Sequence, residues 1–132
     1  MSEILDFAIS HFIRNCCRSC IYGILYHRSR IRQGVAKAEL FLRTKLTDDE
    51  GNIRDIVIWK VERTPHMPEG VRYRLAFVPA RGRRPTILYD NHPPKGHHRH
   101  LGRAPQSAYQ FETVAKLLSD FEASIREHRE KH

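Results

Sequence analysis

The amino-acid sequence predicts an α+β fold, in which a four-stranded antiparallel meander sheet carries a packed C-terminal helix and an additional N-terminal helix precedes it. Three observations lead to this prediction. Apolar residues recur every three or four positions near both ends of the chain and every second position in its middle. The strand-like segments are joined by short turns, which favour an antiparallel meander over parallel crossovers. The last helical segment has one apolar face, which needs a sheet to cover it.

The first 33 residues are expected to form an amphipathic helical extension that precedes the sheet domain. Residues 4–25 have apolar side chains at helical spacing, and Gly34 marks a break before the next element. A small sheet that already carries one helix has little area left to cover this apolar stripe. We therefore expect the chain to self-associate, or to bind a partner protein, through it. The stripe comprises Leu5, Ile9, Phe12, Ile13, Cys16, Cys20 and Ile24.

The α+β domain is expected to span residues 34–127. Segments with strand composition are 36–43, 56–61, 71–78 and 86–89. A turn-forming stretch at 47–52 joins the first two as a hairpin. In the third segment Tyr73, Leu75 and Phe77 share one face, and the arginines between them share the other.

A C-terminal helix is expected to begin after Thr113, whose side chain can cap its first turn. Its apolar face contains Val114, Leu117, Leu118, Phe121 and Ile125. Residues 128–132 are polar, so this tail is expected to fray.

Composition excludes several classes of protein. A chain of 132 residues suits one domain, and no apolar run approaches the roughly 18 residues that a membrane span needs. The three cysteines all fall within residues 16–20, which fits a reducing cytosol and not a disulfide scaffold. The first residues lack the features of a signal peptide. We expect a cytoplasmic protein without membrane contact.

Positive charge points to a polyanionic partner. The chain has 23 Lys and Arg against 15 Asp and Glu, a formal net charge of +8. Residues 81–103 hold six basic residues, one acid and four histidines, so five of the eight net charges fall in this window. Phosphate backbones are the commonest partners of such a field, and the alternative is a protein of high pI that binds no polyanion.

The densest group of chemically active side chains is Tyr89-Asp90-Asn91-His92 followed by Lys95-Gly96-His97-His98-Arg99-His100. If the backbone is extended there, His98 and His100 share one face and Arg99 points the other way. Two imidazoles could take a proton from a ribose 2′-hydroxyl and protonate the leaving oxygen, while a cation stabilises the phosphoryl oxygens. Histidine suits both transfers because its pKa lies near working pH.

Two other interpretations of this segment stay open. His98 and His100, with either His92 or Asp90, could bind a divalent transition metal. Alternatively, the segment is a solvated basic loop whose histidines only contact phosphate or a partner protein. Among the functional interpretations we prefer metal-free chemistry.

Other candidate motifs are weaker. Cys17-x-x-Cys20 lacks a second ligand pair for zinc, and the neighbouring Cys16 falls on an apolar stripe, so we interpret these cysteines as small apolar residues. Trp59 and Tyr73 are expected in the core, and the alternative is that they are platforms for base stacking. Four arginines could form a basic sheet face for RNA, or a plain solvated face: Arg43, Arg54, Arg72 and Arg74.

From about Ala36 to Ile125 the sequence resembles the TumE family, toxins of toxin–antitoxin pairs. The resemblance rests on residues 37–44, on the 89–100 segment described above, and on Phe111 followed by Leu117-Leu118-x-Asp120-Phe121. It implies a bacterial or archaeal cytoplasmic toxin, inhibited by an antitoxin encoded beside it, which we expect to be a helix-turn-helix DNA-binding protein. It does not by itself imply the reaction.

Taken together, these observations predict a toxin that acts on RNA as a metal-independent endoribonuclease and needs no cofactor. His98 and His100 are the candidate acid and base, and Asp90 is the residue expected to orient a histidine. The candidate phosphate-binding residues are Lys95, Arg99, Arg83, Arg84 and Arg103. The rival from another class is a non-catalytic module that blocks a nucleic-acid machine by occupying a phosphate surface.

Overall fold

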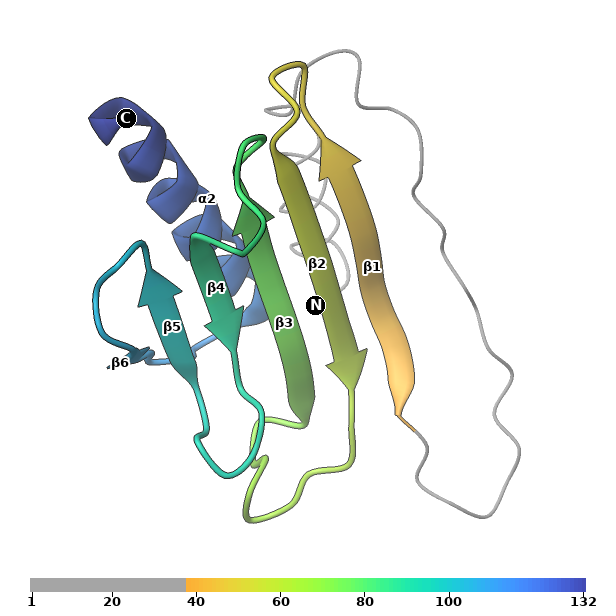
Figure 1. The fold of residues 1–132 in the computed structure, drawn as a ribbon. Helices are drawn as coiled ribbons and strands as arrows, with labels where there is room; N and C mark the ends of the chain where they lie inside the picture. The colour runs from red at the N-terminus through yellow and green to blue at the C-terminus, as the bar shows by residue number, and fades with distance from the viewer. Residues whose placement is uncertain (1–37) are drawn as a thin grey trace.

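One antiparallel sheet and one helix make up residues 38–132, the part of the chain that the computed structural model describes. The six strands follow one another in the sheet in their order along the chain, and α2 lies against one face of it (Figure 1). The elements are β1 Glu39–Thr47, β2 Ile53–Lys60, β3 Val71–Val78, β4 Ile87–Asp90, β5 His98–Leu101, β6 Ser107–Ala108 and α2 Val114–Lys131. The expected N-terminal helix and its apolar stripe lie outside the described residues, as do the three cysteines.

The α+β class, the antiparallel meander and the C-terminal helix are confirmed, but the prediction of four strands is wrong. The sheet has six, because β5 and β6 extend it beyond β4. Both come from the segment rich in Pro, Gly and His, and they have only four and two residues. Strands this short show little alternation of apolar and polar side chains. Their backbone pairing to the neighbouring strand, and not a sequence pattern, makes them strands.

The core lies between α2 and one face of the sheet. Alternate residues of β2, β3 and β4 point into it, with Ile56, Leu75 and Tyr89 among those fully buried. On α2, Leu117, Leu118, Phe121 and Ile125 meet them. Thr113 caps this helix as expected, its side chain accepting a hydrogen bond from the Lys116 amide. The helix continues to Lys131, and the ring of His128 packs edge-on against Phe77.

No helix within residues 38–132 combines the length and the apolar character needed to cross a bilayer.

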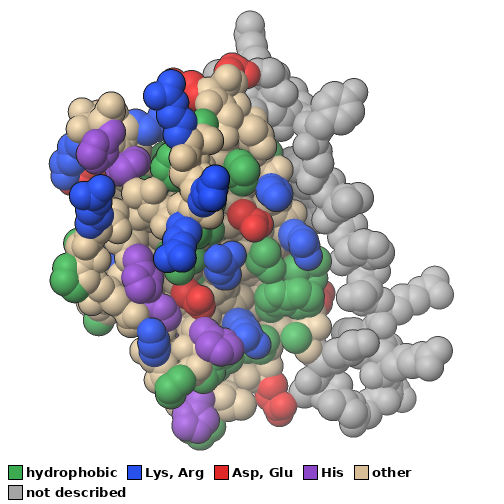
Figure 2. Space-filling model, in the orientation of Figure 1, with side chains coloured by type: hydrophobic (Ala, Val, Ile, Leu, Met, Phe, Trp, Pro, Cys, Tyr) green, Lys and Arg blue, Asp and Glu red, His purple; other side chains and the backbone are tan. Residues whose placement is uncertain are grey.

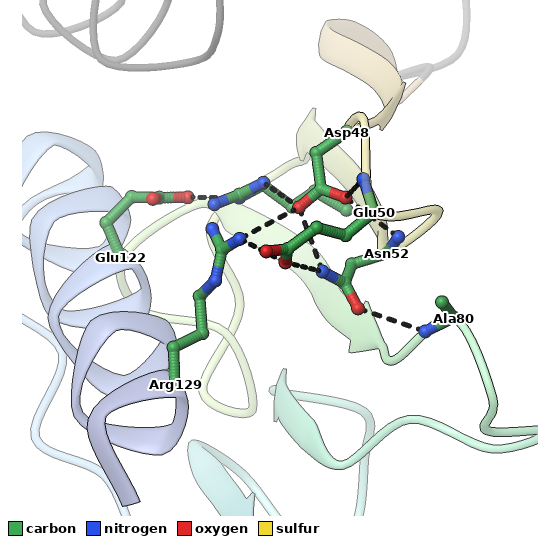
Figure 3. Close-up of polar contacts among 7 residues, drawn as sticks. Asp48, Glu50, Asn52, Ala80, Glu122 and Arg129 are labelled. Atoms are coloured by element: carbon green, nitrogen blue, oxygen red, sulfur yellow. Dashed lines mark hydrogen bonds and ion pairs between the residues drawn. The ribbon is translucent and has the colours of Figure 1, made fainter. Parts of the chain in front are cut away.

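A polar cluster ties the turn between β1 and β2 to α2 (Figure 3). Arg54 points to the helix side of the sheet, where it contacts Asp48 at 3.8 Å and Glu122 at 3.1 Å. Arg129 reaches from α2 to Asp48 and Glu50. Burial would raise the pKa of Asp48, but hydrogen bonds from Asn52 and the charge of Arg129 outweigh it and hold that pKa below its ordinary value. Arg54 is thus a buried structural residue, so neither of the two interpretations, an RNA-binding face or a plain solvated face, holds for it.

Candidate active site

The face of the sheet opposite α2 carries the candidate catalytic residues. Strand register places His98 of β5 opposite Asp90 of β4, and Asp90 opposite Arg74 of β3. Because paired residues of neighbouring strands project to the same face, these three side chains form a row across the sheet. Figure 2 shows this face, on which Lys and Arg side chains gather over the central strands with His side chains beside them.

His98 and His100 share this face, as an extended backbone predicts. Their ring centroids lie 5.5 Å apart at an interplanar angle of 79°. Both belong to β5 and not to an exposed loop, and only 5% of His98 is exposed. The two rings are close enough to act on neighbouring atoms of one bound phosphodiester.

A backbone contact sets the orientation of the His98 ring. Its Nδ1 lies 2.8 Å from the carbonyl oxygen of Gly96. A carbonyl oxygen only accepts hydrogen bonds, so Nδ1 is the nitrogen that carries the proton. In the neutral ring Nε2 is then unprotonated and can accept a proton.

The segment after β4 is fastened to β3 by Asn91, which is buried. Its Oδ1 accepts a hydrogen bond from the Tyr73 amide at 2.9 Å, and its Nδ2 donates to the Val71 carbonyl at 2.7 Å. The side chain thereby replaces a backbone pair and holds the chain in position as it leaves the strand.

The two neighbours of Asn91 have polar contacts as well. Asp90 Oδ1 accepts a hydrogen bond from the His92 amide at 2.9 Å. The His92 ring, through Nδ1, accepts one from the Arg72 guanidinium at 2.8 Å. The orienting contact on His98 therefore comes from Gly96, while the contact found for Asp90 is with the backbone of His92.

Arg99 and Lys95 have polar contacts with residues other than the histidine pair. Arg99 points to the helix side of β5, where its Nη1 donates to the Tyr89 hydroxyl at 3.4 Å. Its Nε is buried without a hydrogen-bond partner among the described residues. Lys95 is exposed in the turn before β5 and donates to Gln106 Oε1 at 3.2 Å. The structure thus brings Asp90, His98 and His100 together and separates Arg99 from them.

The other three candidate phosphate-binding arginines gather at a different place. Arg83, Arg84 and Arg103 line one open hollow, together with Thr86, Gly102 and two histidines of the α2 end. The hollow adjoins the start of β4 and the end of β5, where the Gly102 amide donates to the Thr86 carbonyl. Burial, with a smaller contribution from His132, lowers the pKa of His128. Cations from two loops therefore converge close to the strand that carries His100.

His97 makes contacts that hold parts of the fold together. Its ring stacks on Phe111 with centroids 5.1 Å apart, its Nδ1 lies 2.9 Å from the Tyr73 hydroxyl, and its Nε2 lies 3.2 Å from Glu69. Tyr73 is 2% exposed, which confirms its expected place in the core. These contacts fasten the turn before β5 to β3 and to the loop that precedes β3.

Sequence reasoning placed Trp59 in the core, and this is wrong. Trp59 is half-buried and lies opposite Arg72, on the face that carries the histidine pair. The sequence did contain a signal for this: the buried apolar residues of β2 are Ile56 and Ile58, and Trp59 does not follow their period of two. Arg43, Arg72 and Arg74 are on this face too, which agrees with both interpretations of these arginines, the RNA-binding face and the plain solvated face.

Within residues 38–132 there is no group of three or more His, Cys, Asp or Glu side chains arranged to hold a metal ion. The motif around Cys17 and Cys20 lies outside those residues.

Comparison with known proteins gives one family match. A sequence model of the family described as Toxin TumE matches residues 11–129. The match begins 25 residues before Ala36, where the resemblance drawn from the motifs began. No curated protein and no solved structure matches the chain.

Proposed function

The chain belongs to the TumE toxin family, and from this premise we propose that it arrests growth by cleaving RNA without a metal ion. A toxin of a toxin–antitoxin system implies a cognate antitoxin that restrains it. The nuclease activity, and a helix-turn-helix architecture for that antitoxin, are our proposals.

The observation that carries the nuclease proposal is the pair of imidazoles on β5. His98 has its Nδ1 proton donated to Gly96, which leaves Nε2 free to take the proton of a ribose 2′-hydroxyl. His100, whose ring centroid is 5.5 Å away, is the acid that protonates the leaving 5′-oxygen. The 2′-oxygen bonds to phosphorus as the bond from phosphorus to the 5′-oxygen breaks. The products are a 2′,3′-cyclic phosphate and a 5′-hydroxyl.

Charge on the phosphoryl oxygens needs a nearby cation, and Arg74 is in the row that contains His98. We assign this role to Arg74 in preference to Arg99, which lies on the helix side of the strand. Arg83, Arg84 and Arg103 would bind a phosphate further along the chain, and Lys95 would bind at the turn before β5. Asp90 would limit the positive charge next to His98.

Purified full-length protein incubated with an RNA oligonucleotide, with and without EDTA, tests the proposal. We expect cleavage that EDTA leaves unchanged and products that end in a 2′,3′-cyclic phosphate. A DNA oligonucleotide of the same sequence is the matched control, because it lacks the attacking hydroxyl and must stay intact. Cleavage abolished by EDTA would overturn the metal-free mechanism in favour of a metal-dependent nuclease.

The second candidate function is a non-catalytic inhibitor that occupies a phosphate-binding surface. The hollow lined by Arg83, Arg84 and Arg103 favours it, because three cations converge there on residues other than His98 and His100. Binding of RNA that weakens steeply with salt, together with intact RNA after prolonged incubation, would support this candidate and overturn the nuclease.

A further inference from the structure

We propose that the face opposite α2 binds single-stranded RNA, with one unpaired base stacked on Trp59 and the adjoining phosphates on Arg72 and Arg74. This inference deepens the proposed function and rests on it, because it names the form of RNA that would reach His98 and His100. It is based on the position of Trp59, whose aromatic ring is on the face opposite the core.

Trp59 is the only tryptophan of the chain. It lies near the end of β2, opposite Leu40 on one side and Arg72 on the other, and is half-buried. The core cluster among the described residues does not include it. An indole ring has a flat face on which any base can stack, so such a contact tolerates every sequence.

Cations surround this ring. Arg72 is its direct partner on β3, Arg74 follows two residues later on the same face, and Arg43 is on β1 opposite Val57. All three are exposed, and neither Arg43 nor Arg74 forms an ion pair within residues 38–132. Figure 2 shows basic side chains over the middle of this face. A stacking ring among exposed guanidinium groups has the composition of a single-strand binding surface.

Arg72 is held in place by the hydrogen bond to His92 Nδ1 at 2.8 Å. This contact connects the Trp59 region to the segment that leads into β5. His98 lies three strands away from Trp59 and is displaced by two residues along the strand direction. For strands spaced about 4.8 Å apart, the distance between the two residues is about 16 Å. A short single strand covers that distance, with its phosphates passing Arg72 and Arg74 before they reach the histidine pair.

A duplex does not fit this arrangement, because its bases are stacked on each other and their faces are closed to the protein. The protein should therefore bind single-stranded RNA more tightly than double-stranded RNA. It should also bind a strand with bases more tightly than the same backbone without bases, because stacking adds to the attraction between charges. The sole tryptophan supplies a direct signal, since the fluorescence of Trp59 will change when a base stacks on it.

The experiment uses full-length protein carrying His100→Gln, so that bound RNA is not cut. The probes are a fluorescein-labelled RNA of about eight nucleotides, within the site sizes of about 4–16 nucleotides known for single-strand grooves, and its duplex. A third probe has the same backbone but no bases. We expect quenching of Trp59 by the single strand only, and weaker binding of the other two probes. Trp59→Ala should weaken single-strand binding about tenfold or more, while Trp59→Phe should retain most of it.

Equal affinity for the base-free strand, or for the duplex, would overturn the inference. So would Trp59→Phe weakening binding as strongly as Trp59→Ala, and if the alanine variant does not fold, the base-free probe decides. These outcomes are distinct from a failure of the proposed nuclease. If single-stranded RNA quenches Trp59 in the His100→Gln protein but the wild type does not cut that RNA, the nuclease proposal fails and the stacking site stands. If the wild type cuts the RNA but the His100→Gln protein shows no quenching, the stacking site fails and the nuclease proposal stands.

Discussion

The Nδ1 atom of His98 lies 2.8 Å from the carbonyl oxygen of Gly96, two residues earlier in the chain. Gly96 has φ of 66°, a left-handed conformation that glycine adopts without strain. The turn before β5 thus both starts the strand and orients the ring that follows. A general base that is held by a backbone carbonyl loses little entropy when substrate arrives.

The first prediction concerns this pair. If His98 and His100 are the general base and acid that we propose, His98→Gln and His100→Gln should each lower RNA cleavage by about 10²- to 10⁴-fold and relieve growth arrest. Initial cleavage rates and growth after induction measure the effect. His66→Gln, a change at an exposed histidine in the β2–β3 loop, is the control and should stay active. Because His98 is buried, circular dichroism must show that its variant is folded. A soluble, folded double variant that still arrests growth would refute the mechanism.

The second prediction separates structural from catalytic histidines. His97→Ala should lower the free energy of unfolding by about 1–3 kcal/mol, because it leaves the Tyr73 hydroxyl without its partner. His92→Ala removes an exposed side chain and should change stability by less than about 0.5 kcal/mol. Urea denaturation gives both values. The rate of RNA cleavage per folded molecule should fall less in His97→Ala and His92→Ala than in the variants of His98 and His100. An equal fall would mean that His97 or His92 takes part in catalysis.

The third prediction concerns the arginine hollow. If Arg83 and Arg84 each bind a phosphate, replacing both by Gln should flatten the plot of log affinity against log salt by about 1.4, since a single strand releases about 0.7 ion for each contact. A double variant with Arg63→Gln and Arg126→Gln, at exposed positions of the β2–β3 loop and of α2, controls for the loss of two positive charges. A slope equal to that of the wild type would remove the hollow from the RNA interface.

The fourth prediction concerns Asp120, which accepts hydrogen bonds from the Tyr109 hydroxyl and Lys116 Nζ, both at 2.8 Å. Burial would raise the pKa of Asp120, but hydrogen bonds from Lys116 and Tyr109 outweigh it, so the pKa lies below its ordinary value of 3.8. A lowered pKa contributes stability above the unfolded value, and this contribution is lost as pH falls through the folded value. Asp120→Asn should therefore be less stable than the wild type at pH 7, by about 1–3 kcal/mol.

Denaturation midpoints between pH 7 and pH 3 check this dependence. The difference between wild type and Asp120→Asn should shrink as pH drops below about 3.8, the ordinary value. Glu130→Gln, at an exposed carboxyl of the same helix, is the comparison variant and should have no such dependence. A difference that stays constant down to pH 3 would show that the Asp120 carboxylate is not held by these bonds.

Much of this protein could be predicted from local pattern. A period of two predicted that Tyr73, Leu75 and Phe77 of β3 are buried, although it did not predict the burial of Ala76, and a period of three to four predicted the apolar face of α2. The same rule placed His98 and His100 on one face once an extended backbone was assumed. Such predictions succeed because alternation along one element follows from its own geometry and needs no knowledge of its neighbours.

The tertiary structure decided which face of each strand packs against α2 and which residues of neighbouring strands lie opposite each other. Arg54 and Arg43 look alike as basic residues of adjacent strands, yet the first is buried against Glu122 and the second is exposed on the other face. Likewise, only the pairing of β5 with β4 brings His98 opposite Asp90 and turns Arg99 toward Tyr89. These placements depend on register between strands, which backbone hydrogen bonds distant in sequence establish and which a shift of one residue would reverse.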